Sequence, residues 1–393
     1  MKIGINVSFL RKPGTGIGQV TENVLRTLIS HPRYLTQTHE IFLYCEEEPE
    51  LDFPLPENFH IRTFLPFWKR DDIFRKILWE RHVAFLAEKD ECDVFLSLYQ
   101  SSTVFQSRYD KKQEKVRHIM MVHDIIPHIF PEYQKNARQR IYWKRVEQGI
   151  ALSDRIVTIS ENTKKDLMNE LNIAQEKISV VPLDVNPQFR NTISPEKVSA
   201  VLKKYDLMPG YIYHGGGLEI RKNTGTLLLA YAKMIKSHSI SLETKMPILV
   251  ISGKIFDTKN KLATDVVGLI QTLQLEKDVK LLDFVPDEDL PALYSGSLFF
   301  VYPSLYEGFG LPVLEALCMH TPVLSSDTSS LPEVGGKAVL YTDPKDVDTM
   351  SHQMKCLISD EVLRKTLISQ GALQTLLFSW EKTVEKISAL ITK

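Results

Sequence analysis

Short apolar segments typical of β-strands alternate with amphipathic helices along this chain. Strand patterns cover residues 2–7, 40–45, 60–64, 93–97, 117–122, 155–159, 178–182, 210–214, 247–252, 279–284, 298–302, 321–325 and 338–341. Helical periodicity covers residues 18–30, 73–89, 135–152, 162–171, 223–237, 259–274, 288–294, 312–319 and 345–358. Strands that alternate with helices form parallel sheets whose two faces are covered by helices. The sequence therefore predicts an α/β protein built on doubly wound parallel sheets.

These strand candidates outnumber the strands of one ordinary sheet, which usually has about 4–6. The alternation loosens around residues 186–206. We therefore predict two Rossmann-like domains, residues 1–188 and 207–379, joined by a linker at 189–206. A last helix at about residues 380–393 is expected to pack back on the first domain. Because open α/β sheets bind ligands beyond the carboxyl ends of their strands, we expect the functional site in a cleft between the domains.

The composition is that of an ordinary globular protein with a large core. Of the 393 residues, 43% are hydrophobic and 25% are charged, and the net charge is −1. This even balance gives no indication of a nucleic-acid partner. The four cysteines (Cys45, Cys92, Cys318 and Cys356) lie far apart without metal-ligand spacing, which fits a reducing cytoplasm. The chain begins on a strand pattern instead of a signal peptide, and no apolar run approaches the ~20 residues of a membrane span. We expect a cytoplasmic protein.

The pair Glu307 and Glu315 is the most informative part of the chain for function. A strand pattern ends at Tyr302 and is followed by Glu307, by Gly308 and Gly310, and then by a helix that carries Glu315. The unpaired N–H groups at such a helix start, on a glycine-loosened backbone, can bind an anion. If the anion is a diphosphate, the two carboxylates could hold the hydroxyls of the sugars at its two ends. The alternative is a solvated helix start in which acidic residues are favoured by the helix dipole.

Glycine-rich turns follow the first strand of each half of the chain. Gly14, Gly16 and Gly18 let the backbone approach a phosphate, but their GxGxG order does not fit the GxGxxG dinucleotide fingerprint. A nicotinamide enzyme is therefore disfavoured. In the second half, three glycines are followed by Arg221 and Lys222, which could neutralise a leaving diphosphate without a metal. The alternatives are a ligand-free glycine turn in the first half and a basic surface turn in the second.

Two further polar groups are candidates for chemistry. His123 and Asp124 follow the fifth strand at its carboxyl end, where open α/β folds place their chemistry, although a lone histidine there is more often structural. His128 completes no zinc spacing. The acidic string from Asp287 to Asp289 begins a helical stretch, and the helix dipole explains its acidity better than Mg²⁺ or Mn²⁺ ligation does. We therefore expect no metal site.

Ten segments, in order along nearly the whole chain, carry a family resemblance. They are GTGIGQVTENVL (14–25), LWERHVAFL (78–86), VHDIIPHIFPE (122–132), SDRIVTISENTKKDL (153–167), ISVVPLDVNPQF (178–189), HGGGLEIRKN (214–223), LLDFVPDEDLPALYSGS (281–297), EGFGLPVLEAL (307–317), PVLSSDTSSLPEVGG (322–336) and FSWEKT (378–383). With them the chain resembles a retaining glycosyltransferase of the GT-B fold, in glycosyltransferase family 4. The Glu-x7-Glu element within EGFGLPVLE is the most specific of these signals.

The resemblance implies roles for individual residues. Glu307 corresponds to the carboxylate that contacts the hydroxyls of the donor sugar, and Glu315 to the one that holds the nucleotide ribose. Lys222 matches the phosphate-binding lysine, and His123 matches the histidine beside the transferred sugar. The implied catalytic residues are thus Glu307, His123 and Lys222. The implied donor-binding residues are Gly16, Gly18, Arg221, Lys222, Val285, Glu307, Gly308, Phe309, Gly310, Leu311 and Glu315.

Some of the implied contacts belong to the backbone, and two positions depart from the family pattern. The backbone of residues 309–311 would meet the sugar and the diphosphate, and Val285 lies where the family backbone reads the nucleobase. Many members have an arginine where this chain has Gly216, and Arg221 is expected to take that role. Asp184 replaces a common glycine near the linker, which bears on the hinge more than on the chemistry.

The resemblance implies transfer of a hexose from a nucleotide-diphosphate sugar, with GDP-mannose favoured, to a hydroxyl of a glycan or lipid-linked acceptor in polysaccharide or glycoconjugate biosynthesis. Retention of anomeric configuration, a front-face reaction and independence of metals and cofactors are expected. One alternative is a catalytically silent GT-B protein that binds a sugar nucleotide or another partner. A phosphorylase would need pyridoxal phosphate on a lysine, and nothing in the sequence provides that setting.

Residues 64–81 raise the separate question of contact with a membrane surface. They mix aromatic residues with five cations, which are Lys69, Arg70, Arg75, Lys76 and Arg81. Such a segment can lie on an anionic bilayer and receive a lipid-linked acceptor, in which case the protein would be peripheral at the inner membrane surface. The alternative is an ordinary core helix, because LWERHVAFL matches one in the family.

Overall fold

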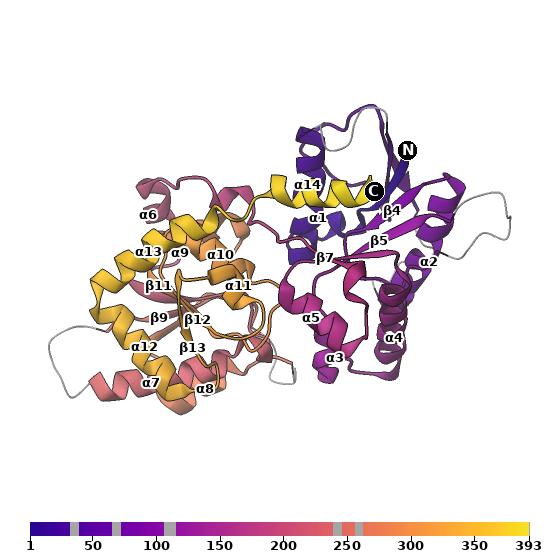
Figure 1. The fold of residues 1–393 in the computed structure, drawn as a ribbon. Helices are drawn as coiled ribbons and strands as arrows, with labels where there is room; N and C mark the ends of the chain where they lie inside the picture. Colours follow the sequence, from indigo (N-terminus) through magenta and orange to yellow (C-terminus); the bar gives the residue numbers. More distant parts are fainter. Residues whose placement is uncertain (32–38, 65–71, 106–114, 239–245, 256–261, 393) are drawn as a thin grey trace. The chain divides into compact units, whose positions relative to one another are not determined.

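The computed structural model describes residues 1–31, 39–64, 72–105, 115–238, 246–255 and 262–392. They form two compact units. Unit 1 comprises Met1–Leu183 and Ser379–Lys393, and unit 2 comprises Asp184–Phe378. Within each unit, helices pack against a parallel sheet (Figure 1). The α/β class predicted from the alternation of strands and helices is confirmed.

Unit 1 contains a seven-stranded parallel sheet of order β3-β2-β1-β4-β5-β6-β7. Its strands are β1 (Lys2–Asn6), β2 (Glu40–Cys45), β3 (Phe59–Thr63), β4 (Val94–Ser97), β5 (Arg117–Val122), β6 (Arg155–Thr158) and β7 (Ile178–Val180). Its helices are α1 (Gly16–Ser30), α2 (Ile73–Lys89), α3 (Ile126–Ile129), α4 (Ala137–Leu152), α5 (Glu161–Glu170) and α14 (Trp380–Ile391). Helices α2 and α4 pack on one face of this sheet. Trp79 of α2 is fully buried there among residues of β2 and β4.

Helix α14 completes unit 1 although it comes from the far end of the chain. It packs on α1, and its buried residues Trp380, Val384, Ile387 and Ile391 follow the 3–4 residue spacing of an amphipathic helix. The guanidinium of Arg117 on β5 donates to the carbonyl oxygen of Ile391. The Thr383 hydroxyl donates to the carbonyl oxygen of Pro182 at 2.7 Å.

Unit 2 contains a six-stranded parallel sheet of order β10-β9-β8-β11-β12-β13. Its strands are β8 (Tyr211–His214), β9 (Leu249–Ile251), β10 (Val279–Leu281), β11 (Ser297–Tyr302), β12 (Val323–Ser326) and β13 (Val339–Thr342). Its helices are α6 (Pro195–Lys204), α7 (Thr224–His238), α8 (Val266–Leu273), α9 (Leu290–Gly296), α10 (Leu311–Cys318), α11 (Leu331–Gly335), α12 (Val347–Ser359) and α13 (Glu361–Thr375).

The side chains of β11 point alternately to the two faces of this sheet. Phe299 and Val301 are buried in the cluster that includes residues of α7, α8 and α12. Phe300 and Tyr302 point to the other face, where their rings stack at 5.6 Å between centroids and Phe300 also meets Tyr294 of α9. Because side chains alternate along a strand, Tyr302, the last residue of β11, points to the same face of the sheet as Phe300.

Residues 189–206, for which the sequence suggested a linker, are part of unit 2 and carry α6. The helix packs on α9, with Val201 and Leu202 buried. Ser194 caps it and Pro195 occupies its first turn, a favourable place because a proline there sacrifices no intrahelical hydrogen bond.

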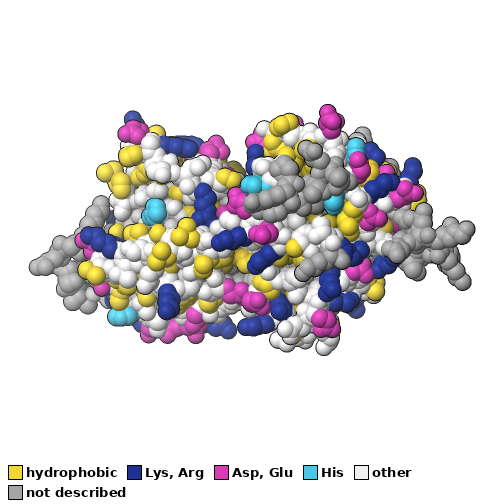
Figure 2. All heavy atoms as spheres, turned by 45° about the horizontal axis from the view of Figure 1, so that its top comes forward, with side chains coloured by type: hydrophobic (Ala, Val, Ile, Leu, Met, Phe, Trp, Pro, Cys, Tyr) yellow, Lys and Arg dark blue, Asp and Glu magenta, His cyan; other side chains and the backbone are white. Residues whose placement is uncertain are grey.

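The surface mixes both signs of charge, as the face in Figure 2 shows, in keeping with the small net charge. None of the helices in the described part of the chain is long and apolar enough to cross a bilayer. Within residues 64–81, Lys69 and Arg70 lie outside the described residues. Arg75 is buried and pairs with Glu46 and Glu47, so it does not face solvent as the membrane hypothesis required.

Candidate active site

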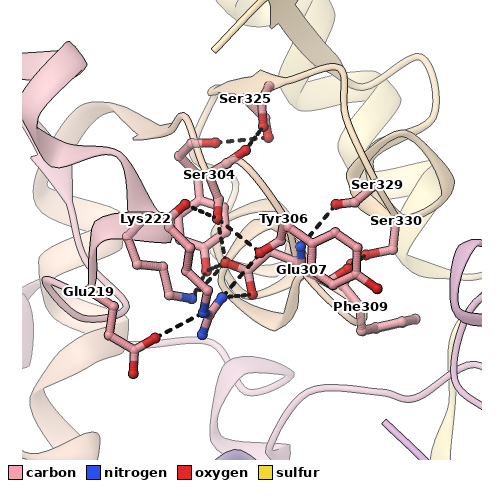
Figure 3. Close-up of polar contacts among 12 residues, drawn as sticks. Glu219, Lys222, Ser304, Tyr306, Glu307, Phe309, Ser325, Ser329 and Ser330 are labelled. Carbon is pink, nitrogen blue, oxygen red and sulfur yellow. Dashed lines mark hydrogen bonds and ion pairs between the residues drawn. The ribbon is translucent and has the colours of Figure 1, made fainter. Parts of the chain in front are cut away.

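The carboxyl edge of the sheet in unit 2 brings two distant parts of the sequence together. Strands β8 and β11 are neighbours, so the loops that follow them lie side by side. The loop after β8 ends in a 3₁₀ turn that carries Lys222, and the loop after β11 carries Glu307. Lys222 Nζ lies 2.7 Å from Glu307 Oε1 (Figure 3). The structure thus joins two residues that the sequence proposed independently.

In the part of the chain that the structure describes, four donors hold the carboxylate of Glu307. Its Oε1 accepts from Lys222 Nζ, from the Tyr302 hydroxyl at 2.9 Å and from the Ser304 hydroxyl at 2.7 Å. Its Oε2 lies 2.8 Å from a guanidinium nitrogen of Arg221. The Tyr302 hydroxyl also accepts from Lys222 Nζ at 2.5 Å, so this one phenol touches both members of the Lys222–Glu307 pair. Each of these groups is therefore fixed in place before any ligand binds.

The charges of this cluster are strongly coupled. Burial alone would raise the pKa of Glu307, but Lys222 and Arg221 lower it to about 2, so the carboxylate stays ionised. Burial lowers the pKa of Lys222, and the charge of Glu307 opposes that shift. Glu219 pairs with Arg221 at 2.9 Å from a more exposed position. Lys222 and Arg221 thus bring two basic groups to the edge of the sheet, which suits an anionic ligand.

Hydrogen bonds to backbone carbonyl oxygens connect the two loops. The carbonyl oxygen of Arg221 accepts from the Leu305 amide at 2.7 Å and lies 3.0 Å from the Ser304 hydroxyl oxygen. The Asn223 side chain, whose residue has φ of +60°, donates to the carbonyl oxygen of Pro303 at 3.0 Å. The cations and the carboxylate consequently sit on a braced backbone instead of on a free loop.

Serines at the end of β12 and in the turn after it hydrogen-bond to the Glu307 loop. The Ser330 hydroxyl lies 2.8 Å from the carbonyl oxygen of Glu307 and 2.7 Å from that of Phe309. The Ser325 hydroxyl donates to the carbonyl oxygen of Tyr302 at 3.1 Å. The Glu307 amide itself donates to Ser329 Oγ at 3.0 Å (Figure 3).

Helix α10 starts directly after this loop, as the sequence predicted. Its N-cap, Gly310, has φ of +116°, and a Cβ there would approach a side-chain carbon of Leu331 to 2.7 Å. Glycine suits this position because residues with a Cβ rarely adopt such a φ. Further along α10, Glu315 accepts from the Tyr294 hydroxyl at 2.9 Å, and burial raises the pKa of Glu315 to about 7.

Three of the predicted site residues belong to unit 1. His123 follows β5 and is buried, its Nε2 lies 2.8 Å from the carbonyl oxygen of Leu98, and its own carbonyl accepts from the Thr163 hydroxyl. Burial lowers the pKa of His123 to about 4, so the ring is neutral at pH 7. Because a carbonyl can only accept, Nε2 carries the proton.

Gly16 and Gly18 both lie in the first turn of α1, which starts two residues before the predicted residue 18. A Cβ at Gly18 would lie 2.0 Å from the carbonyl oxygen of Lys12, whereas a Cβ at Gly16 would meet nothing within 4 Å. The tight packing at Gly18 is therefore required by the fold itself. The exposed Gly16 leaves the helix start open.

The remaining candidates, Val285 and the acidic string from Asp287 to Asp289, lie in the segment after β10. Val285 is buried in the loop after β10. Asp289 accepts from Lys204 at 2.6 Å and from Tyr205 at 2.7 Å, so the acidic string has a structural use. Within the ranges that the structure describes, no three His, Cys, Asp or Glu side chains form a group that could hold a metal ion.

A cavity of about 710 Å³ lies elsewhere in unit 2. Its lining includes Pro209, Ser295 and His320, which precede β8, β11 and β12, so it opens at the amino edge of the sheet, opposite the charged cluster. None of the predicted site residues lines it. This cavity therefore takes no part in the charged cluster.

Sequence reasoning missed several members of the site. Tyr302, Ser304, Ser329 and Ser330 all contact Glu307, yet none was a candidate. A signal existed for the first two, because a tyrosine and a serine at the carboxyl end of an apolar strand stand where ligands bind. The two serines after β12 carry no such signal in the sequence.

Comparison with known proteins identifies the family. Residues 16–189 match the family described as Glycosyltransferase Family 4, and residues 202–374 match Glycosyl transferases group 1. The chain is 35% identical over 277 residues to the O-antigen chain mannosyltransferase B of Escherichia coli, with 70% of each chain covered. The chain belongs to glycosyltransferase family 4. The resemblance inferred from the motifs is confirmed, and the protein is a glycosyltransferase.

Other relatives of this glycosyltransferase are more distant. It is 27% identical over 67% of its length to the serotype-specific mannosyltransferase WbdA of Escherichia coli, of which it spans 32%. It is also 27% identical to the O-antigen chain mannosyltransferase RfbU of Salmonella typhimurium, with 60% of this chain and 59% of that protein covered. The match to WbdA thus accounts for about a third of that longer protein.

Solved structures confirm the fold of the transferase. WaaG, a glycosyltransferase involved in lipopolysaccharide biosynthesis, matches with a TM-score of 0.70 over 100% of both chains at 14% identity. HepE of Anabaena, in complex with UDP and glucose, matches with a TM-score of 0.70 at 15% identity, with 100% of this chain and 99% of that chain covered. At such identities the likeness concerns the GT-B fold alone.

Proposed function

We propose that this glycosyltransferase moves a hexose, with mannose favoured, from a nucleotide-diphosphate sugar to a hydroxyl of a glycan or lipid-linked acceptor during polysaccharide synthesis. The observation that carries the proposal is the buried Lys222–Glu307 pair with Arg221 at the carboxyl edge of the sheet in unit 2. The preference for mannose rests on the names of the relatives, several of which are O-antigen mannosyltransferases. GDP as the carrier is what the family resemblance of the sequence implies.

The residues of the cluster suit departure of a nucleoside diphosphate. In the proposed reaction the bond between the anomeric carbon and the diphosphate oxygen breaks, and the acceptor oxygen bonds to the same face of that carbon. The acceptor proton passes to the leaving diphosphate, so the anomeric configuration is retained. Lys222 and Arg221 would neutralise the charge that develops on the diphosphate, and electrostatic stabilisation of this kind usually contributes most to the rate enhancement of an enzyme. No step requires a metal ion.

Glu307 has two tasks in this proposal. It keeps the two cations in position before the donor arrives, and it offers its remaining acceptor capacity on Oε2 to hydroxyls of the donor sugar. Glu315 would hold the ribose and His123 would lie beside the transferred sugar, as the family resemblance implies. Since His123 is neutral and its Nε2 proton is engaged, we assign it a positioning role and no proton transfer.

A panel of nucleotide sugars tests the proposal directly. The protein is incubated with GDP-mannose, GDP-fucose, UDP-glucose and UDP-galactose, each with and without oligosaccharide or polyprenyl-diphosphate-linked saccharide acceptors. We expect acceptor-dependent release of nucleoside diphosphate, fastest with GDP-mannose, and unchanged rates in EDTA. The α- or β-linkage of the product, determined by NMR, reports retention or inversion. Failure of every donor, or full dependence on Mn²⁺, would refute the proposal.

Replacing Lys222 by alanine tests the role of the cluster. We expect kcat to fall by ~10²-fold or more, as when an oxyanion donor is removed. Lys204→Ala is the matched control, because Lys204, the last residue of α6, pairs with Asp289 and not with Glu307. Equal activity of the two variants would remove Lys222 from the catalytic residues.

A further inference from the structure

Ser329 stands apart from the other hydroxyl residues at the end of β12 and in the turn after it. The hydroxyls of Ser325, Ser326, Thr328 and Ser330 all donate to backbone carbonyl oxygens between residues 302 and 309. Ser329 instead accepts, from the Glu307 amide at 3.0 Å. A serine hydroxyl has one proton to donate as well as lone pairs to accept with. Within the described residues, the Ser329 proton has no acceptor.

The backbone at Ser329 is also unusual. Its φ is +53°, in the left-handed region that residues with a Cβ rarely adopt. Strained residues of this kind cluster at ligand clamps and active sites, where the surrounding structure holds them in place. Here the flanking Ser330 and Thr328 are both tied to the Glu307 loop, so the turn keeps Ser329 against it. The strain and the unused proton occur in the same half-buried residue.

We propose that the Ser329 hydroxyl donates a hydrogen bond to an oxygen atom of the bound donor and thereby strengthens donor binding. The inference rests on the proposed function, because it takes the Glu307 loop as the place where the donor sugar and diphosphate bind. The hydrogen bond from the Glu307 amide fixes Ser329 Oγ beside Glu307 (Figure 3). The hydroxyl proton of Ser329 is then available to the ligand. A sugar hydroxyl and a diphosphate oxygen are both suitable acceptors.

Two substitutions separate the hydroxyl from the backbone. Ser329→Gly removes the hydroxyl and relieves the strain, since glycine adopts positive φ freely, whereas Ser329→Ala removes the hydroxyl and keeps the strain. An effect on donor binding that both variants share is therefore due to the hydroxyl. Asn172→Gly serves as the matched control, because Asn172 has the same φ of +53° in unit 1. Thermal melts establish that each variant is folded.

The expected result is a rise of roughly tenfold in KM for the donor in both Ser329 variants, the loss that one hydrogen bond of about 1.4 kcal/mol would give. Inhibition by the free nucleoside diphosphate and rates with singly deoxygenated donor sugars identify the acceptor. If it is a sugar hydroxyl, diphosphate inhibition is unchanged, and one deoxy donor is penalised in the wild type but not in the variants. If it is the diphosphate, inhibition weakens by the same factor and no deoxy donor stands out.

Wild-type KM, kcat and inhibition in both variants would overturn the inference while leaving the proposed function intact. A rise in KM in Ser329→Gly alone would also overturn it, because the altered backbone, and not the lost hydroxyl, would then be the cause. A wild-type protein that transfers no sugar from any nucleotide sugar would overturn the proposed function and this inference together.

Discussion

Tyr302 shows how much of this site depends on a single uncharged atom. Its hydroxyl contacts Lys222 Nζ and Glu307 Oε1 at once, and its ring lies under the ammonium group at 5.0 Å from Nζ to the ring centroid. The ring is fully buried on the face of the sheet that β11 shares with α9. The phenol therefore sets the direction of the lysine without carrying a charge at neutral pH.

Tyr302→Phe is predicted to lower kcat by about tenfold, because hydrogen bonds to charged groups contribute about 1.5–3 kcal/mol. The ring and its packing remain, so the melting temperature should change little. Tyr213→Phe on β8 is the control, since that hydroxyl bonds to Ser252 outside the charged cluster. Steady-state kinetics and thermal melts of both variants check the prediction. Equal kcat in the two variants would show that Tyr302 does not orient Lys222.

Glu307 and Glu315 differ in pKa because their surroundings differ. Two cations lower the pKa of Glu307 to about 2, whereas Glu315 is buried beside the neutral Tyr294 and its pKa is raised to about 7. If Glu315 holds ribose hydroxyls as a carboxylate, KM for the donor should fall as pH rises from about 6 to 8. Glu315→Gln should raise KM and make it independent of pH over this range. A wild-type KM that does not change with pH would contradict this role.

The raised pKa of Glu315 also makes the stability of the protein depend on pH. The pKa of Glu315 is raised above its unfolded value of about 4.3, so the folded state binds the extra proton between these two values. Stability contributed by this group should therefore decline as pH rises from about 4.3 to 7. Glu315→Gln should remove that decline, which chemical denaturation at several pH values will detect.

At the scale of elements, the start of α1 offers a matched pair of glycines. Gly18→Ala places a Cβ against the carbonyl oxygen of Lys12 and should destabilise unit 1 or displace the loop before α1. Gly16→Ala meets no atom and should keep the stability or raise it slightly, because alanine favours a helix over glycine by about 1 kcal/mol. Melting temperatures of the two variants test this contrast, and stability that is equal in both would contradict it.

Activity provides a second measurement at the same helix. If the open start of α1 approaches the donor phosphates, Gly16→Ala should raise KM for the donor in a protein of normal stability. An unchanged KM would leave Gly16 outside the donor site. The two variants thus separate a glycine that the fold requires from one that a ligand would require.

Prediction from the sequence succeeded where a local pattern determines the element. All thirteen strands of the described residues, β1 to β13, fall on the predicted segments with ends that differ by a few residues, because apolar runs between helices leave little alternative. Helix α6 was missed although Ser194, Pro195 and the spacing of Val198, Val201 and Leu202 give start and face signals. The loosened alternation of strands and helices predicts a linker there, whereas Pro195 stands in the first turn of a helix.

The chemistry of the site was predictable only in part. Glu307, Glu315 and Lys222 stand in motifs, and the neighbouring positions of β8 and β11 bring Lys222 and Glu307 into contact. The contacts of Tyr302 and Ser329 depend on how side chains of different loops approach one another. No spacing along the sequence reports that approach, so these residues emerge only from the structure.

At the scale of the whole molecule, the chain leaves unit 1 at Leu183 and returns to it at Ser379. The returning helix α14 buries Ile387 completely and packs on α1, whose first turn holds Gly16 and Gly18. The stability of unit 1 therefore depends on a segment that is synthesised after all of unit 2. Unit 2, in contrast, is continuous in sequence and needs nothing from α14 for its own core.

Ile387→Ala should accordingly weaken unit 1 and spare unit 2. Removal of a fully buried isoleucine side chain costs about 2–5 kcal/mol of unfolding free energy. Hydrogen exchange followed by mass spectrometry should show faster exchange in α1 and α14, with protection in α7 and α10 preserved. Glu385→Ala is the control on the exposed face of the same helix and should leave both units unchanged. Equal loss of protection in the two units would instead mean that they unfold as one, because a defect confined to α14 would then have spread into a unit whose core it does not touch.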